Sequence, residues 1–161
     1  MMAFHDDLLR QARHLACKER KGAKQASLRR AVSTAYYAVF HLLIAEAVSN
    51  WSKPEVQGSL ARAFDHGTMK SASNQIQNKN KFPFIGEDPV TVSRLKAVAL
   101  AFAQLQQERH TADYDGTRIW TRSEALEQVD AAMKAFSDWK AIRQERIAQA
   151  YLVSLLVKHR G

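Results

Sequence analysis

The sequence predicts an all-α fold, an up-and-down bundle of about five helices in a single domain over residues 1–161. The chain has only six glycines and three prolines, which leaves few turns and favours a small number of long helices over many short strands. In the stretch 27–50, apolar residues recur at steps of four and three, with no glycine or proline between them: Leu28, Val32, Ala35, Val39 and Leu42.

The stretch 27–50 is expected to be the central helix of the bundle. At about 1.5 Å per residue it would form a rod of roughly 36 Å, long enough to span a small domain. A second apolar line adjoins the first, so at least two other helices should pack against it. That line is Tyr36, Phe40, Leu43 and Ala47. A polar file lies beside them, and there we expect any chemistry of this helix: Arg30, Thr34, Tyr37 and His41.

Three further helices are expected before residue 116. The first covers residues 3–20, and the next begins at Pro54 and closes at His66-Gly67. Residues 68–81 are polar and predict a short helix or a mobile segment. Asp88 is then a candidate N-cap, because Pro89 follows it at the first position of a helix that runs to about residue 115.

The last helix is expected from about residue 121 to residue 158. Thr121 and Glu124 have the spacing of a capping box, and no glycine or proline follows before Arg160. Such a helix would be roughly 55 Å long, longer than its neighbours, so part of it should overhang. Its apolar tail, residues 150–157, is expected either to be exposed for a partner or to fold back on the first helix as core.

The chain is basic, and its excess charge lies near the ends. The net charge is +8, while residues 1–30 and 140–161 together carry +9. If the first and last helices are neighbours, they form a basic surface that fits the phosphates of RNA or DNA. A solvated surface that promotes solubility is the alternative.

Common enzyme and metal signatures are absent from the sequence. Six histidines are scattered without HExxH spacing, and neither a Walker loop nor a GxSxG motif occurs, so we expect no metal and no cofactor. The single cysteine excludes an internal disulfide and favours a reducing cytoplasm. No run approaches 18 apolar residues, and the first ten residues are unlike a signal peptide, so no membrane association is expected.

The most unusual polar cluster is Glu108-Arg109-His110-Thr111-Ala112-Asp113-Tyr114-Asp115. Arg109 offers a fork of donors for phosphate, His110 can move a proton near neutral pH, and Tyr114 can stack on a base. Alternatively, the cluster is a structural network in which Asp113 neutralises Arg109. The same structural alternative applies to Tyr37 and His41.

Two stretches resemble HEPN-domain proteins. They are the central helix, with Ser27-Leu28-Arg29-Arg30-Ala31 leading into Ala35-Tyr36-Tyr37-Ala38-Val39-Phe40-His41, and the segment from Arg109 to Tyr114. The resemblance implies an all-α bundle and a homodimer in which two copies of the Arg motif face a shared cleft. Many members of that family are metal-independent ribonucleases, acting as toxins of toxin-antitoxin pairs, in CRISPR effectors or in other defence systems. It also implies an antitoxin partner, nucleotidyltransferase-like in some pairs.

Carried onto this chain, the resemblance implies that Arg109 binds and polarises the scissile phosphate and that His110 fills the polar position after it. The nuclease motif then requires a histidine, where this chain has Tyr114. Tyrosine, with a reference pKa near 10, is a poor general base at neutral pH, which argues against cleavage by the usual route. The Arg-x4-Tyr form resembles a branch of small HEPN proteins for which nucleic-acid binding or a toxin-antitoxin role has been suggested.

Two hypotheses follow. In the first, the chain is a cytoplasmic HEPN-like dimer that binds RNA, with metal-independent cleavage as a further step, at a cleft lined by Arg30, Tyr37, His41, Arg109, His110, Asp113 and Tyr114. In the second, it is a helical scaffold whose Arg109 network is structural and whose apolar tail docks another chain. A nuclease needs Arg109 and a histidine exposed in one groove, whereas a scaffold buries them.

Overall fold

The computed structural model describes residues 2–78, 82 and 84–157 and confirms an all-α protein. Within these residues the chain forms seven helices and no strand, two helices more than the sequence predicted. Their bounds are α1 Phe4–Ala16, α2 Gln25–Val48, α3 Pro54–Ala61, α4 His66–Gln75, α5 Pro89–Tyr114, α6 Arg122–Ile142 and α7 Arg146–Ser154.

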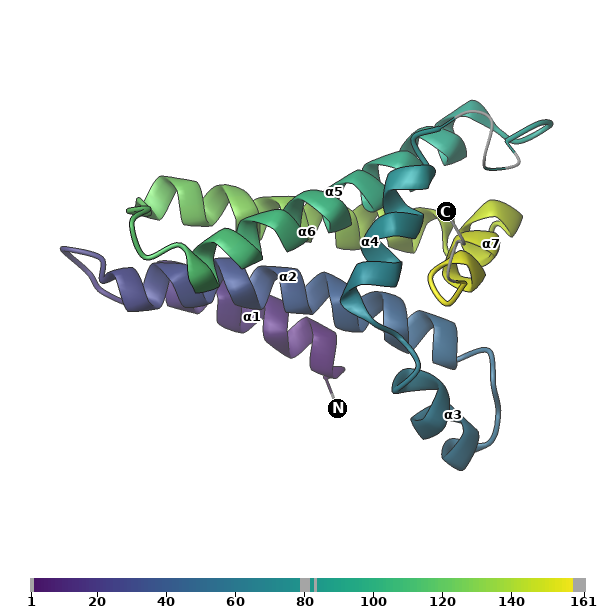
Figure 1. Cartoon of the computed structure of the whole chain (residues 1–161), viewed down its shortest axis with the longest axis horizontal. Coiled ribbons are helices and arrows are strands. Elements are labelled where there is room, and N and C mark those ends of the chain that lie inside the picture. The colour runs from purple at the N-terminus through teal and green to yellow at the C-terminus, as the bar shows by residue number, and fades with distance from the viewer. Residues whose placement is uncertain (1, 79–81, 83, 158–161) are drawn as a thin grey trace.

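Four helices, α1, α2, α5 and α6, form the body of the bundle (Figure 1). Helix α2 packs against the other three, as its two apolar lines predicted, and thirteen of its 24 residues are buried. Among the described residues, α2 is the one helix long and apolar enough to cross a membrane by composition. However, 61% of its most apolar window is buried in the bundle, as expected for the core helix of a water-soluble protein.

The local signals at helix starts are confirmed. The Asp88 carboxylate accepts a hydrogen bond from the backbone N–H of Thr91, and Pro89 occupies the first turn of α5. At the start of α6, Thr121 and Glu124 form the complete capping box. The expected stop at His66-Gly67 is wrong, because Asp65 caps a new helix, α4, that begins at His66. The short-helix alternative for the segment that follows is correct, since α4 runs to Gln75.

The single long helix from about 121 to 158 is also wrong. The chain leaves α6 after Ile142 and starts α7 at Arg146, with Glu145 in an extended conformation. The Gln149 side chain donates to the Arg143 carbonyl at 2.6 Å and so satisfies one of the groups freed by the turn. Residues 158–161 lie outside the described part of the chain.

The turn lets the apolar tail join the core. Helix α7 packs against α2, α4 and α5, and its side chains Ile147, Ala148, Tyr151 and Leu152 are buried. A straight helix would have left these side chains in water, which costs about 1.5–3 kcal/mol for a large apolar residue. The expected overhang is therefore wrong. The fold-back alternative is correct in that the tail is part of the core. Its expected neighbour is wrong, because the tail packs on α2, α4 and α5, whereas α1 packs on α2 and α6.

Candidate functional site

Arg109 lies on the side of α5 that faces α2, against two tyrosines. Its guanidinium carbon is 5.1 Å from the ring centre of Tyr36 and 5.7 Å from that of Tyr37. Both distances are within the range of cation–π attraction. Tyr36 is fully buried and Tyr37 half-buried, and the Arg109 side chain is 12% exposed. The pairing of α2 with α5 therefore brings together Arg109 and Tyr37, two residues of the expected cleft that lie 72 positions apart in the sequence.

Asp113 partly neutralises Arg109. It lies one turn later on α5, with a carboxylate oxygen 3.7 Å from a terminal nitrogen of Arg109. The Ser33 hydroxyl donates to the same oxygen at 3.2 Å. The Nε of Arg109 is buried and has no hydrogen-bond partner. The guanidinium also hydrogen-bonds the Tyr36 hydroxyl. Since 3.7 Å exceeds hydrogen-bond distance and Nε has no partner, part of its donor capacity stays unused.

His66, the first residue of α4, is the histidine that sequence reasoning missed. Its Nδ1 lies 2.5 Å from the Tyr36 hydroxyl, and its ring stacks on Phe40 at 4.3 Å between ring centres. The ring centres of Tyr36 and Tyr37, which Arg109 contacts, lie 5.5 and 5.9 Å from that of His66. The hydrogen bond occupies Nδ1 and leaves Nε2 as the ring nitrogen available to a ligand.

The surroundings of the site keep the His66 imidazole and the Tyr36 phenol uncharged. Burial, followed by the positive charge of Arg109, lowers the pKa of His66, while Asp65 opposes the shift. Burial raises the pKa of the Tyr36 hydroxyl well above its usual value, and Arg109 opposes this. At neutral pH the site therefore holds one fixed cation beside a neutral imidazole and a protonated phenol.

His110 and Tyr114, expected beside Arg109, form a separate pair. Both are exposed, and their ring centres are 4.9 Å apart. Tyr114 is 71% exposed. At about 100° per residue, His110 and Tyr114 lie roughly 100° and 140° around α5 from Arg109, so they face a different direction. Among the described histidines, His66 rather than His110 shares the tyrosine rings with Arg109.

His41 and Arg30 extend the site along α2. The ring centre of His41 lies 6.4 Å from that of Tyr37 and 4.9 Å from that of Phe4, which is 60% exposed. Burial, His5 and His66 lower the pKa of His41. Arg30 is exposed two turns before Tyr37. The line of rings from Tyr37 through His41 to Phe4 leads from Arg109 to the start of α1.

Arg29, which is adjacent to Arg30, hydrogen-bonds backbone carbonyls at and after the end of α5. One of its terminal nitrogens donates to the carbonyls of Ala112 at 2.9 Å and Asp115 at 2.8 Å, and the other donates to the carbonyl of Arg118 at 2.5 Å. It thereby satisfies carbonyls at the end of α5, which a helix leaves without internal partners. Arg29 fixes to α2 the turn of α5 that carries Arg109 and Asp113.

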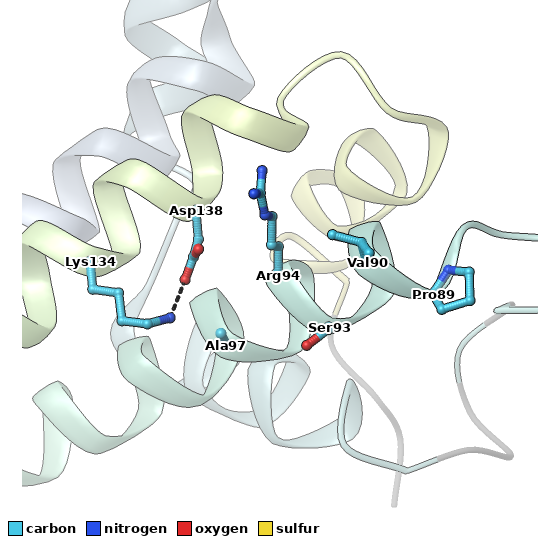
Figure 2. A pocket seen from close by; sticks show the side chains of 7 residues that line it. All are labelled: Pro89, Val90, Ser93, Arg94, Ala97, Lys134 and Asp138. Atoms are coloured by element: carbon cyan, nitrogen blue, oxygen red, sulfur yellow. Dashed lines mark hydrogen bonds and ion pairs between the residues drawn. The ribbon is translucent and has the colours of Figure 1, made fainter.

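A groove of about 390 Å³ lies elsewhere, between the start of α5 and the end of α6 (Figure 2). Arg94 stands beside the ion pair of Lys134 with Asp138, whose atoms are 2.6 Å apart. None of the candidate site residues lines it. Over residues 2–78, 82 and 84–157, no group of three or more His, Cys, Asp or Glu side chains could hold a metal ion.

The chain was compared with protein families, curated proteins and solved structures, and no match was found.

Proposed function

We propose that the chain is a cytoplasmic, HEPN-like RNA-binding protein whose site is centred on Arg109. The observation that carries this proposal is the under-used guanidinium. Its Nε has no partner, and its nearest carboxylate stands at 3.7 Å. Arginine presents a planar fork of donors that matches phosphate oxygens, so a backbone phosphate is the ligand that would complete its bonding.

The side chains around Arg109 fit the other parts of a nucleotide. Tyr37, His41 and Phe4 offer partly exposed rings in sequence, and bases of any identity stack on such rings. Exposed Arg30 would contact a second phosphate. His110 and Tyr114 form an outer ring pair that a longer strand would reach. The proposal therefore favours single-stranded RNA with its bases unpaired.

Cleavage is a separate step of the proposal and needs a histidine. His66 replaces His110 and Tyr114 as the candidate, because it shares two tyrosine rings with Arg109 and is held neutral. A toxin role with a nucleotidyltransferase-like antitoxin, and the shared-cleft homodimer, remain expectations from the family resemblance.

A second candidate function is a non-catalytic scaffold. The observation that favours it is the burial of Arg109, whose side chain is only 12% exposed and lies beside Asp113. In this case Arg109 ties α5 to the tyrosines of α2 and binds nothing. A buried arginine of that kind stabilises the fold, and its loss would lower stability without any effect specific to RNA.

The deciding experiment is fluorescence anisotropy with a labelled single-stranded RNA in EDTA. We expect Arg109→Ala to raise the dissociation constant about tenfold or more and to reduce the salt dependence of binding. Arg94→Ala, which removes an exposed arginine from the other end of α5, away from the site, is the matched control and should have a small effect. If both variants behave alike while circular dichroism shows intact folds, the scaffold function is supported instead.

Incubating the same RNA with a 5′ label tests cleavage. If fragments form in EDTA, we expect His66→Gln to abolish them and His110→Gln to leave them. Fragments that persist in both histidine variants and in Arg109→Ala would come from a contaminating nuclease. Intact RNA with Arg109-dependent binding would make the protein a reader of RNA rather than a nuclease.

A further inference from the structure

The Tyr36 hydroxyl is hydrogen-bonded on two sides. Its oxygen lies 2.5 Å from Nδ1 of His66, and the Arg109 guanidinium also hydrogen-bonds it. Since a guanidinium has donors and no acceptor, Tyr36 accepts from Arg109. Tyr36 is fully buried, so its own proton needs an acceptor inside the protein. Among the described residues, Nδ1 of His66 is the acceptor within hydrogen-bond distance of this hydroxyl.

These hydrogen bonds decide which nitrogen of His66 carries the proton. A neutral imidazole has one donor nitrogen and one acceptor nitrogen, and the bond made by one nitrogen fixes the state of the other. Because Nδ1 accepts from Tyr36, the proton of the neutral ring is on Nε2. The opposite tautomer would leave the buried Tyr36 proton without an acceptor, and buried hydroxyls rarely lack one.

The Nε2–H group of His66 reaches solvent in a fixed orientation. His66 is half-buried, and its Nε2 is not among the buried nitrogen and oxygen atoms that lack a partner. In the part of the chain that the structure describes, no side chain or backbone group hydrogen-bonds to Nε2. Phe40 stacks on the ring at 4.3 Å between ring centres and fixes its plane. His66 therefore offers one oriented donor to a ligand.

A single phosphate group can reach this donor and Arg109 together. Two nitrogens bonded to the same hydroxyl oxygen are at most about 6 Å apart, and the imidazole ring adds about 2 Å, so Nε2 lies within about 8 Å of the guanidinium. Two phosphate oxygens about 2.5 Å apart, each about 2.9 Å from its donor, span up to about 8 Å. The separation of the two donors therefore fits one phosphate.

We propose that Tyr36 holds His66 in the tautomer with its proton on Nε2, and that this N–H and the Arg109 guanidinium donate together to two oxygens of one RNA phosphate. Tyr36 is a positioning residue, because it is buried and acts through the two donors that it contacts. The proposal rests on the phosphate ligand proposed above for Arg109 and adds a second donor to it.

The tautomer also defines the part of His66 in the cleavage step. Its Nε2 already carries a proton and cannot take another from a 2′-hydroxyl while the ring stays neutral. His66 therefore acts on the phosphate oxygens, where negative charge grows in the transition state, rather than as the base.

Nitrogen-15 NMR of the imidazole side chains tests the tautomer in the free protein, without RNA. At about pH 8, above the reference pKa of histidine, His66 should show a protonated Nε2 and an unprotonated Nδ1. Tyr36→Phe keeps the ring but removes the hydroxyl, and it should shift His66 toward the other tautomer. Exposed His14 of α1 is the reference signal and should not change. A wild-type His66 protonated on Nδ1, or one whose tautomer is unchanged in Tyr36→Phe, would overturn the proposal.

Titration with inorganic phosphate at constant ionic strength, with sodium chloride as the compensating salt, tests the pair of donors separately from RNA. Phosphate should shift the Nε2 signal of His66, and Arg109→Ala should weaken this binding about tenfold. A phosphate titration that leaves His66 unchanged, or that shifts it equally in Arg109→Ala, would overturn the proposal.

RNA binding by anisotropy completes the test. His66→Phe, which keeps a ring on Phe40, should raise the dissociation constant about tenfold, and Tyr36→Phe should raise it about threefold. His14→Phe is the matched control and should have little effect, and circular dichroism confirms that each variant is folded. If His66→Phe binds RNA like the wild type while Arg109→Ala does not, the second donor is refuted. If the wild type binds phosphate through both residues but no RNA, the proposed function fails and the phosphate site remains.

Discussion

A buried pair of hydroxyl groups joins α4 to α7 and gives a quantitative test of how the C-terminal segment packs. The Ser73 hydroxyl donates to the carbonyl of Met69 at 2.7 Å, and the Tyr151 hydroxyl lies 2.7 Å from the same Ser73 oxygen. Because the only Ser73 hydroxyl proton is used by Met69, Tyr151 must donate to Ser73. Both residues are fully buried, so neither can replace its partner with bulk water.

Ser73→Ala and Tyr151→Phe should therefore have unequal costs. Ser73→Ala leaves the Tyr151 hydroxyl buried without a partner, which costs about 2 kcal/mol. Tyr151→Phe removes one donor but leaves Ser73 bonded to Met69, which costs about 1 kcal/mol. The double variant removes both hydroxyls together and should cost about 1 kcal/mol, so the two changes should be coupled by about 2 kcal/mol.

Equilibrium unfolding in urea, followed by circular dichroism and tryptophan fluorescence, measures these free energies. Ser73→Ala should also lower Tm by about 4–8 °C, at about 2–4 °C per kcal/mol for a chain of this size. Ser137→Ala, an exposed position on α6, is the control. If Ser73→Ala matched Ser137→Ala, or if the two hydroxyl deletions were additive, α7 would not be docked on α4, and the overhanging tail would be the better description.

Three further predictions concern other contacts. Arg29→Ala should lower the free energy of unfolding by about 2 kcal/mol, because three carbonyls at and after the end of α5 lose a charged donor, and Arg29→Lys should recover part of it in the same urea assay. Thr121→Ala should cost about 1 kcal/mol through loss of the capping box, again measured in urea, whereas Thr121→Ser should be nearly neutral. Burial is the largest cause lowering the pKa of His5, His41 and His66 from 6.5, so below that pH the unfolded chain binds more protons than the folded protein. In urea titrations, the free energy of unfolding should therefore be independent of these histidines above about pH 6.5 and should fall as the pH is lowered below it. His66→Gln should make this fall with pH shallower.

Structural features that depend on short stretches of sequence, such as helix periodicity and helix caps, were predictable. The period of residues 27–50 identified α2 as the central helix, because a stripe too wide for one neighbour requires several. Asp88 with Pro89 and Thr121 with Glu124 located two helix starts, since capping depends on residues within one turn. These signals need no knowledge of the rest of the fold.

Features that depend on distant packing were not predictable. No glycine or proline marks the turn at residues 143–145, and the helix breaks because the apolar face of α7 gains more by packing on α2, α4 and α5. His66 was taken as the end of a helix, although Asp65 before it and Thr68 after it have the pattern of an N-cap. Reading Asp65 as a cap would have corrected that boundary, but not the contact of His66 with Tyr36.

In the candidate site, too, contacts within one helix were predictable and contacts between distant segments were not. Arg109 and Asp113 are one turn apart on one helix, so their pairing followed from spacing alone. His110 is adjacent to Arg109 in the sequence but points elsewhere, whereas His66 is 43 positions away and shares two rings with it. Neighbours along a helix diverge by about 100°, so adjacency in a motif is a poor guide to contact in a bundle.

The state of Arg109 is what separates the two candidate functions. A structural arginine in a bundle is normally satisfied by a bidentate carboxylate or by backbone carbonyls, as Arg29 is in this protein. Arg109 has instead two tyrosine rings, a hydrogen bond with the Tyr36 hydroxyl, a carboxylate at 3.7 Å and an Nε without a partner. An unsatisfied buried donor costs free energy, which a ligand that completes the bonding would recover. The contrast between Arg29 and Arg109, which contact the same pair of helices, is therefore the strongest structural argument for a phosphate ligand at Arg109.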